Sequence, residues 1–440
     1  STEWYQAGDL RPIGRWMAAA PGIDGIIEVS NLTQLQLIDA NLSGSYRLTG
    51  DIDASATASA ASSSGIWGAG GFSPIGNNGT SSISSRFTGV FDGGGLVISD
   101  LTIVRPSANY VGLFGRLENS TITDVRLDAI SVRGNFYVGG LVGYHVNSAL
   151  SEISTAGEVN GFDIVGGIAG VQAGGFITAA MSSAKVTGNN YVGGLVGSQS
   201  DGYISQAWAS GEVTGNIFVG GLVGLQSTGG SILQAWATGT VDGFENVGGL
   251  VGAASAGSLI AQAWAGGAVD GSNNVGGFVG RQDGTVTASF WNTDMTGQGN
   301  GQGAGSGTFN ATGLTSAQFQ DTAGFMALAA PLGWDFKTVW APSSTGFYPD
   351  LYSISKIVAV DAGSANRVYG DSNANLAINY YGLRPGDFLK TRAVLTGLPG
   401  QTANVGVYAF TASGAAATDS SYRFVYVPGA LTVTPRGLTI

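Results

Sequence analysis

The chain of 440 residues contains no cysteine and only one histidine, His145. Without cysteine, the chain has no disulfide, no thiolate metal ligand and no thiol nucleophile. His145 lies two residues after a glycine-rich block, in a predicted turn. We therefore expect a solvated or stacked side chain there rather than a general base, and we identify no Ser/His/Asp set.

Charged residues and long apolar runs are also scarce. Only 11% of the residues are charged, and the net charge of −11 argues against nucleic acid and anionic membrane surfaces as partners. No apolar run approaches the roughly 18 residues that a membrane-spanning helix needs, so we expect no direct membrane insertion. The chain opens without a signal-peptide pattern and ends on a strand pattern, which leads us to expect a piece of a longer protein.

Glycine, by contrast, is abundant, with 74 residues, and much of it recurs in one block. The block reads Val-Gly-Gly-Leu-Val-Gly or a close variant. Its copies are Val111–Gly115, Val138–Gly143, Val165–Gly170, Val192–Gly197, Val219–Gly224, Val247–Gly252 and Val275–Gly280. Their starting positions are 27, 27, 27, 27, 28 and 28 residues apart, which identifies a repeat architecture.

Each period holds about three short strand-like segments separated by Gly, Asn and Ser. One such unit cannot bury its apolar side alone, but stacked units form a continuous core. We therefore predict an all-β chain: a right-handed parallel β-helix, or solenoid, followed by a small β-rich domain. Adjacent coils should be about 4.8 Å apart. The glycines are expected where backbones approach closely or where φ is positive.

Four regions follow from this pattern. Residues 1–110 are predicted to be irregular coils that cap the solenoid, and residues 111–292 to be the repeat solenoid itself. Residues 293–352 are predicted to cap its far end and to include a helix that begins with a capping box at Thr315. Residues 353–440 lack the repeat and alternate as a separate small β domain.

Stacking places equivalent residues above one another in columns. One predicted column is aromatic: Met181, Trp208, Trp236, Trp264 and Trp291. A second, two residues before three of these tryptophans, contains Gln206, Gln234 and Gln262. Two interpretations remain open for both columns. They stabilise the solenoid by stacking and amide hydrogen bonds, or they form an exposed strip that binds a glycan.

Charged residues form two further columns. Glu158, Lys185 and Glu212 alternate in sign and could pair along the rod. Asp242, Glu245 and Asp270 should lie close together on consecutive coils. We interpret these three as a solvated acidic edge, with calcium binding as the alternative. No Asp-rich calcium-binding nonapeptide occurs, so we expect no metal site and no cofactor.

The repeated block resembles the GLUG motif of large bacterial surface and secreted proteins. The lead-in runs Phe72-Ser-Pro-Ile-Gly76 and Phe87-Thr-Gly-Val-Phe-Asp-Gly93 are similar to what precedes that motif in filamentous-haemagglutinin-like adhesins. The last region resembles the MBG/YDG type of adhesin repeat, at Val368-Tyr-Gly-Asp371 and at the closing run Leu431-Thr-Val-Thr-Pro-Arg-Gly-Leu-Thr-Ile440. This resemblance implies a two-partner-secretion adhesin of the biofilm matrix. It also implies an extracellular location at the bacterial cell surface, and export of the parent protein through an outer-membrane transporter.

The function expected from this resemblance is cell–cell adhesion and biofilm cohesion. The expected partner is an exopolysaccharide or cell-surface glycan, with self-association as a further option. One alternative is a spacer that projects another adhesive tip. A second is a polysaccharide-degrading β-helix enzyme, which would need clustered acids and bases. We identify no such cluster and expect no enzymatic activity.

Overall fold

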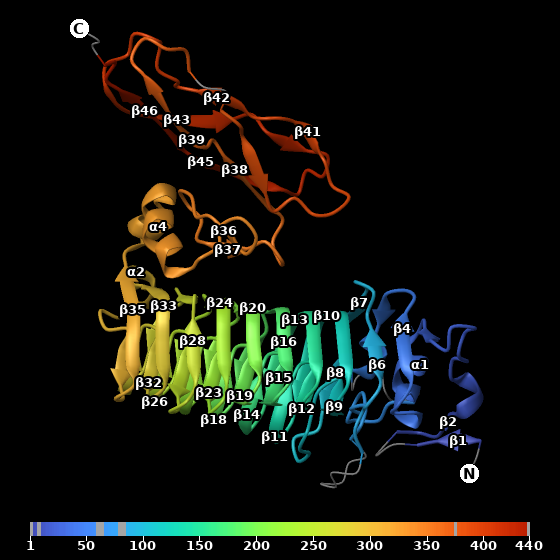
Figure 1. The fold of residues 1–440 in the computed structure, drawn as a ribbon. Coiled ribbons are helices and arrows are strands. Elements are labelled where there is room, and N and C mark those ends of the chain that lie inside the picture. Colours follow the sequence, from blue (N-terminus) through green and yellow to red (C-terminus); the bar gives the residue numbers. More distant parts are fainter. Residues whose placement is uncertain (1–2, 7–9, 59–65, 78–84, 374–375, 438–440) are drawn as a thin grey trace. The chain divides into compact units, whose positions relative to one another are not determined.

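The computed structural model describes residues 3–6, 10–58, 66–77, 85–373 and 376–437. The chain forms two compact units, Ser1–Leu314 and Thr315–Ile440, and each is built mainly of strands (Figure 1). No helix among the described residues has the length and apolar character needed to cross a bilayer.

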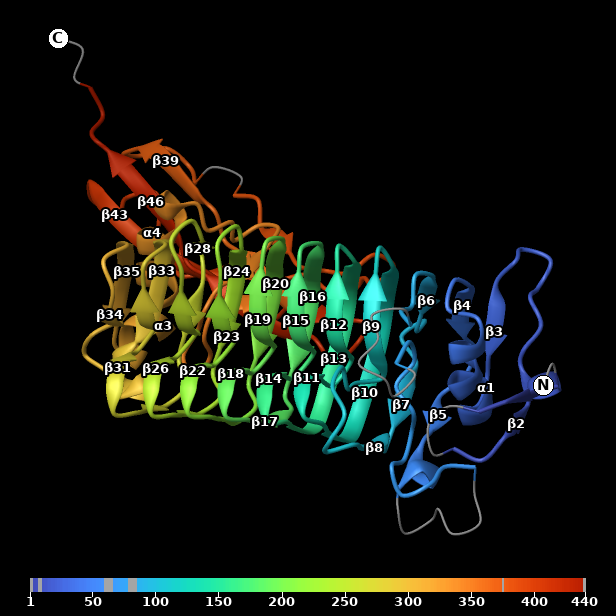
Figure 2. The same cartoon turned by 90° about the horizontal axis from the view of Figure 1, so that it is seen from below.

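The first unit is a parallel solenoid with three sheets along its length (Figures 1 and 2). Sheet 1 contains β9 (Phe114–Glu118), β12 (Val142–Val146), β15 (Ala169–Ala173), β19 (Val196–Ser200), β23 (Val223–Gln226), β27 (Val251–Ala254), β32 (Val279–Gln282) and β34 (Gln302–Ala304). Sheet 2 contains β11 (Phe136–Gly139), β14 (Asp163–Gly166), β18 (Asn190–Gly193), β22 (Ile217–Gly220), β26 (Glu245–Gly248) and β31 (Asn273–Gly276).

Sheet 3 receives two or more short segments from most coils. Its strands in the repeat region are β10 (Thr121–Arg133), β13 (Ala149–Asn160), β16 (Phe176–Ser182), β17 (Lys185–Thr187), β20 (Tyr203–Ala209), β21 (Val213–Thr214), β24 (Ser231–Ala237), β25 (Val241–Asp242), β28 (Leu259–Ala261), β29 (Trp264–Ala265), β30 (Val269–Asp270), β33 (Thr285–Asn292) and β35 (Thr308–Leu314). Each pairs in parallel with its equivalent in the next coil, which confirms the predicted parallel β-helix.

The lead-in coils extend sheet 3 toward the amino terminus. Their strands are β3 (Ile27–Val29), β4 (Ser45–Leu48), β5 (Ile52–Asp53), β6 (Val90–Asp92), β7 (Val97–Ser99) and β8 (Thr102–Val104). The last three pair in parallel with β10. Helix α1 (Leu32–Leu37) and an antiparallel pair, β1 (Trp4–Tyr5) and β2 (Ile13–Gly14), complete this part. At the other end, α2 (Thr293–Thr296), β34 and β35 form the last coil.

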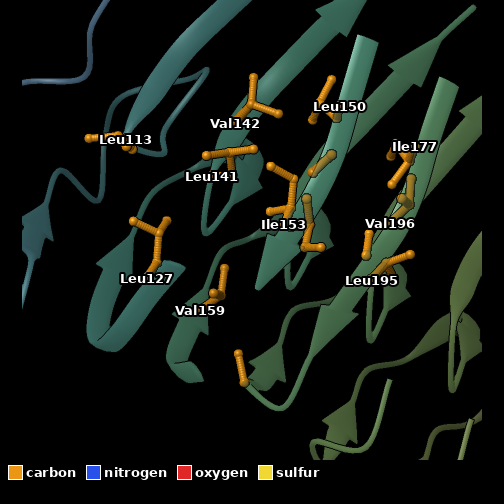
Figure 3. Close-up of a cluster of buried hydrophobic side chains, with 14 of the residues drawn as sticks. Leu113, Leu127, Leu141, Val142, Leu150, Ile153, Val159, Ile177, Leu195 and Val196 are labelled. Atoms are coloured by element: carbon orange, nitrogen blue, oxygen red, sulfur yellow. The ribbon is translucent and has the colours of Figure 1, made fainter. Parts of the chain in front are cut away.

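Apolar columns fill the interior of the solenoid. Figure 3 shows Leu141, Leu150 and Ile153 turned toward the interior between the sheets. These side chains have essentially no exposed surface, and their equivalents in the following coils are buried to the same extent. Each buried apolar side chain contributes roughly 1.5–3 kcal/mol to stability, so each coil adds a similar amount to the stability of the solenoid.

The glycines of the repeated block are required by close backbone approach. A Cβ atom on Gly166 would lie 2.1 Å from the Ala169 carbonyl oxygen, and one on Gly194 would lie 2.2 Å from the Gly221 carbonyl oxygen. Positive φ occurs instead at the non-glycine residue just before each block, such as Tyr137 (φ 60°) and Ile164 (φ 59°). The structure therefore explains these glycines by close backbone approach and not by positive φ.

The second unit begins with α3 (Ser316–Gln320) and α4 (Thr322–Ala329). The predicted capping box is confirmed, because the Thr315 hydroxyl accepts from Gln318 N and the Gln318 side chain accepts from Thr315 N. The strands that follow are β36 (Trp340–Ala341), β37 (Asp350–Leu351), β38 (Ile357–Asp361), β39 (Ser364–Val368), β40 (Asn379–Tyr381), β41 (Leu389–Thr391), β42 (Val394–Thr396), β43 (Gly406–Ser413), β44 (Ala416–Ala417), β45 (Arg423–Val427) and β46 (Gly429–Thr434). β36 and β37 lie within residues 293–352, the region predicted as a cap, and β38 to β46 form the predicted small β-rich domain, which has its own core. Residues 438–440 of the closing run lie outside the described residues.

Candidate functional site

Trp208 and Trp236 of the predicted column are half-buried on the outward side of sheet 3, whereas Trp264 is fully buried. In β20, Ala207 and Ala209 are buried in the core, so Trp208 between them points outward. Trp208, Trp236 and Trp264 are in register. The Trp208 and Trp236 ring centroids are 4.8 Å apart with planes 3° from parallel, and those of Trp236 and Trp264 are 5.5 Å apart at 20°. Neighbouring rings therefore cover one another's faces.

Trp291 is not part of this column, contrary to the prediction. Phe290 pairs with Trp264, whereas Trp291 pairs with Ala265. Trp291 is buried, and its indole Nε1–H donates to the Gln298 carbonyl oxygen at 3.1 Å. The cause is the spacing within β33. Val286 pairs with Ile260, and Trp291 lies five residues after Val286, whereas Trp264 lies four residues after Ile260.

The predicted glutamine column is an amide ladder at a bend in sheet 3. Gln206, Gln234 and Gln262 are half-buried and have φ of 48°, 55° and 51°. The Gln234 Nε2 group donates to Gln262 Oε1 at 3.2 Å. This contact is the one that the stacking interpretation expects. Glycan binding by the tryptophan and glutamine columns stays a prediction.

The three predicted acidic residues do not converge on one point. Asp242 and Asp270 are exposed neighbours in sheet 3, but Glu245 begins β26 in sheet 2 and pairs with Asn273. Within the part of the chain that the structure describes, no three His, Asp or Glu side chains are placed to hold a metal ion.

The predicted charge ladder forms one clear ion pair. The Lys185 Nζ atom lies 3.0 Å from Glu212 Oε2, and both side chains are about half exposed. Exposed pairs of this kind contribute only about 0–1 kcal/mol, so this pair adds little to the stability of the rod.

His145 is fully buried within β12, so the expectation of a solvated residue in a turn was wrong. Burial without compensating charge lowers the pKa of His145 to about 3. The imidazole is therefore neutral at ordinary pH and enclosed by the core, where it does not reach a substrate in solvent.

A buried column of polar side chains, which includes His145, was not predicted from the sequence. Its glutamines are Gln172, Gln199, Gln226 and Gln282, all without exposed surface. Three of them donate from Nε2 to backbone carbonyls at the start of the next coil's strand: Gln172 to Tyr203, Gln199 to Ser231 and Gln226 to Leu259, at 3.1–3.2 Å. The available signal was a polar residue two positions after the last glycine of these blocks.

Aromatic side chains at the edges of the rod were also overlooked. Phe162, Tyr203 and Phe244 are each about half exposed. Phe162 borders a surface groove of about 500 Å³, which is lined by Pro106, Arg133, Gly134, Asn160, Gly161, Phe162 and Thr187. The sequence signal was a Gly-Phe pair at the same place in two periods, at Gly161-Phe162 and Gly243-Phe244.

Comparison with known proteins gives partial matches. Residues 358–432 match the family model described as "MBG domain (YGX type)". A segment of 138 residues, 30% of the chain, is 41% identical to Halomucin of Haloquadratum walsbyi, but it spans only about 1% of that protein. The predicted MBG-type repeat is thus confirmed, and the two matches together suggest a surface-associated, adhesin-like repeat protein.

One solved structure is also similar: a candidate immunoglobulin A1 protease from Bacteroides ovatus. It is 18% identical, and the likeness covers 77% of this chain and 96% of the other, with a TM-score of 0.46. A score this low does not establish a shared fold.

Proposed function

We propose that this chain is part of a large extracellular surface adhesin and that it binds polysaccharide along its solenoid. One observation carries the proposal: exposed aromatic rings at Phe162 and Tyr203 are fixed to a rigid ladder of coils, beside columns of neutral polar residues. Aromatic surfaces combined with amide and hydroxyl groups suit sugar rings, which carry both C–H faces and hydroxyls.

The repeated architecture supports this proposal through multivalency. Coils spaced about 4.8 Å apart present equivalent groups again and again along one direction. A polymer that contacts several coils gains avidity even where each contact is weak. Cell–cell adhesion and biofilm cohesion would follow, because one polysaccharide chain could then connect many such rods.

The comparisons support a surface location for this function. An MBG-type domain follows the solenoid, and part of the chain is similar to Halomucin. From the resemblance to filamentous-haemagglutinin-like adhesins, we further propose two-partner secretion through an outer-membrane transporter, with self-association of rods as an added route to cohesion. Catalysis, cofactors and bound metal are not part of the proposal.

Co-sedimentation of the full chain with purified exopolysaccharides, neutral and acidic, tests this function. We expect saturable binding to at least one polysaccharide. Trp236→Ala should be included in the same assay. If the tryptophan column binds sugar, this variant should lose binding while keeping its melting temperature; if the column is structural, the melting temperature should fall and binding per folded molecule should persist.

A spacer that projects another adhesive tip is the second candidate. The stacking of Trp208 on Trp236 favours it for this column, because ring faces that contact each other are not free to contact sugar. Absence of binding to every polysaccharide would contradict adhesion by this part of the chain and support the spacer.

A further inference from the structure

The groove beside Phe162 combines an aromatic ring with an unpaired cation. Arg133, the last residue of β10, is exposed and belongs to an outward column that continues in register through Asn160 and Thr187. No ion pair or hydrogen bond of the Arg133 guanidinium occurs among the described residues. On a chain of net charge −11, a cation left without an internal partner is free to pair with an external anion.

Arg133 is the one charged residue among those that line the groove, and no carboxylate is among them. Asp163 follows Phe162, but its Oδ1 atom accepts from Asn190 N at 2.9 Å and from the Asn189 side chain at 3.3 Å. Glu158, two residues before Asn160, is likewise not among the residues that line the groove. An anion that enters the groove therefore meets the Arg133 guanidinium and the neutral groups of Asn160 and Thr187.

Neighbouring coils hold Phe162 in place. Its backbone N donates to the Asn135 carbonyl at 2.8 Å, and its carbonyl accepts from Asn189 N at 2.7 Å. Its ring meets that of Phe136 edge to face, with centroids 5.7 Å apart. About half of the Phe162 side chain remains exposed, so the groove has an aromatic wall that need not be ordered on binding.

We infer that this groove binds a uronic acid residue of an acidic polysaccharide, which deepens the proposed function and rests on it. The Arg133 guanidinium donates to the sugar carboxylate, the Phe162 ring packs against the C–H face of the sugar, and the Asn160 and Thr187 side chains hydrogen-bond to hydroxyls. Arginine suits this role because its planar donor pair matches the two oxygens of a carboxylate.

The rod contains its own control for this site. Phe244 occupies the same corner three coils further on, linked through the backbone hydrogen bonds of Asn189 and Asn216, and it is exposed to the same degree. The strand before it ends in Asp242, which corresponds to Asn160 of the Phe162 site. Asp242 pairs with Thr214 in the preceding coil and with Asp270 in the next, where the Phe162 site has Arg133 and Thr187. A carboxylated sugar would be repelled there, although the aromatic ring is equivalent.

Titration calorimetry of the full chain with a short galacturonic acid oligomer tests the inference, because a short oligomer limits avidity. Arg133→Gln and Phe162→Ala should each weaken binding about tenfold or more. Phe244→Ala should leave the affinity unchanged. The methyl-esterified oligomer should bind the wild type weakly, and Arg133→Gln should bind the charged and esterified oligomers equally. Thermal melting of each variant checks that the solenoid is intact.

The inference is overturned if Arg133→Gln binds like the wild type, or if Phe244→Ala loses as much affinity as Phe162→Ala. If these variants still co-sediment with polysaccharide as the wild type does, the adhesive function stands and only this site is wrong. If the wild type binds no polysaccharide of any kind, the proposed function and this site both fall.

Discussion

At the residue scale, the solenoid tolerates conformations and burials that are costly in isolation. Non-glycine residues adopt left-handed φ at equivalent corners of successive coils, among them Tyr137, Ile164 and Tyr191. Such a conformation costs roughly 1–2 kcal/mol per residue. His145 is held neutral in the core. Because the same position recurs in every coil, the energetic cost of one residue can be measured by replacing it with the residue type that another coil has at the equivalent position.

His145 predicts a loss of stability in acid. Its pKa is lowered to about 3 in the folded chain, so below about pH 6.5 the unfolded chain binds the extra proton. The contribution of neutral His145 to the free energy of unfolding is fully present above pH 6.5. As the pH falls from 6.5 toward the folded pKa, this contribution decreases by about 1.4 kcal/mol per pH unit. Denaturant unfolding of the wild type and of His145→Gln, measured from pH 7 to pH 4, checks this.

The glutamine variant matches the other members of the buried column and cannot titrate. We expect the wild type to lose stability relative to His145→Gln as the pH falls below 6.5. Parallel curves for the two proteins would show that the imidazole is not buried.

Replacing Ile164 with an aromatic residue should stabilise the solenoid. Ile164 is β-branched, which makes its left-handed conformation especially unfavourable, and it lies between two tyrosines in its column. Elsewhere in this column, Tyr110 stacks on Tyr137 at 4.9 Å and Tyr191 on Phe218 at 5.1 Å. Ile164→Tyr should therefore raise the free energy of unfolding by about 1 kcal/mol. Ile164→Val keeps the branching and should give no gain; equal effects of both variants in denaturant melts would contradict the argument.

At the element scale, the glycine block and the buried glutamines determine how coils stack. The block allows backbones to approach where a Cβ would collide with the next coil. The glutamine amides bind carbonyls of the following coil, which favours one register over others. Apolar columns alone would specify the register less sharply, because many of their positions carry interchangeable valine, leucine and isoleucine.

Gly194→Ala should destabilise the solenoid by about 3 kcal/mol, because the added Cβ meets backbone atoms that have no room to move. Gly299→Ala is the matched control, since a Cβ there meets nothing within 4 Å. Urea titration should give a clearly lower free energy of unfolding for Gly194→Ala than for Gly299→Ala. Equal, small effects would show that neighbouring coils can move apart.

At the scale of the whole molecule, the two compact units have separate cores. We therefore expect two transitions in calorimetry rather than one. Leu195→Ala, in the core of the solenoid, should lower only one transition temperature, and Phe410→Ala, in the core of the second unit, only the other. Each substitution should cost about 2–5 kcal/mol. A single transition that both variants shift would mean that the units unfold together.

The sequence by itself determined the solenoid. The spacing of the glycine blocks specified parallel stacking, and the in-register valines confirm it. The sequence also indicated the capped helix at Thr315 and the MBG-type domain. The solenoid and the capping box are repeated or local, so they can be read from spacing alone, whereas the MBG-type domain was expected from its resemblance to that family.

Tertiary structure decided the rest. The direction of Trp208, the exclusion of Trp291, the burial of His145 and the groove at Arg133 and Phe162 all depend on how coils are placed in three dimensions. Trp291 lies one residue beyond the position that pairs with Trp264 and is therefore outside its predicted column. Linear spacing cannot reveal such shifts, because contacts between coils depend on hydrogen-bond register rather than on the count of residues along the chain.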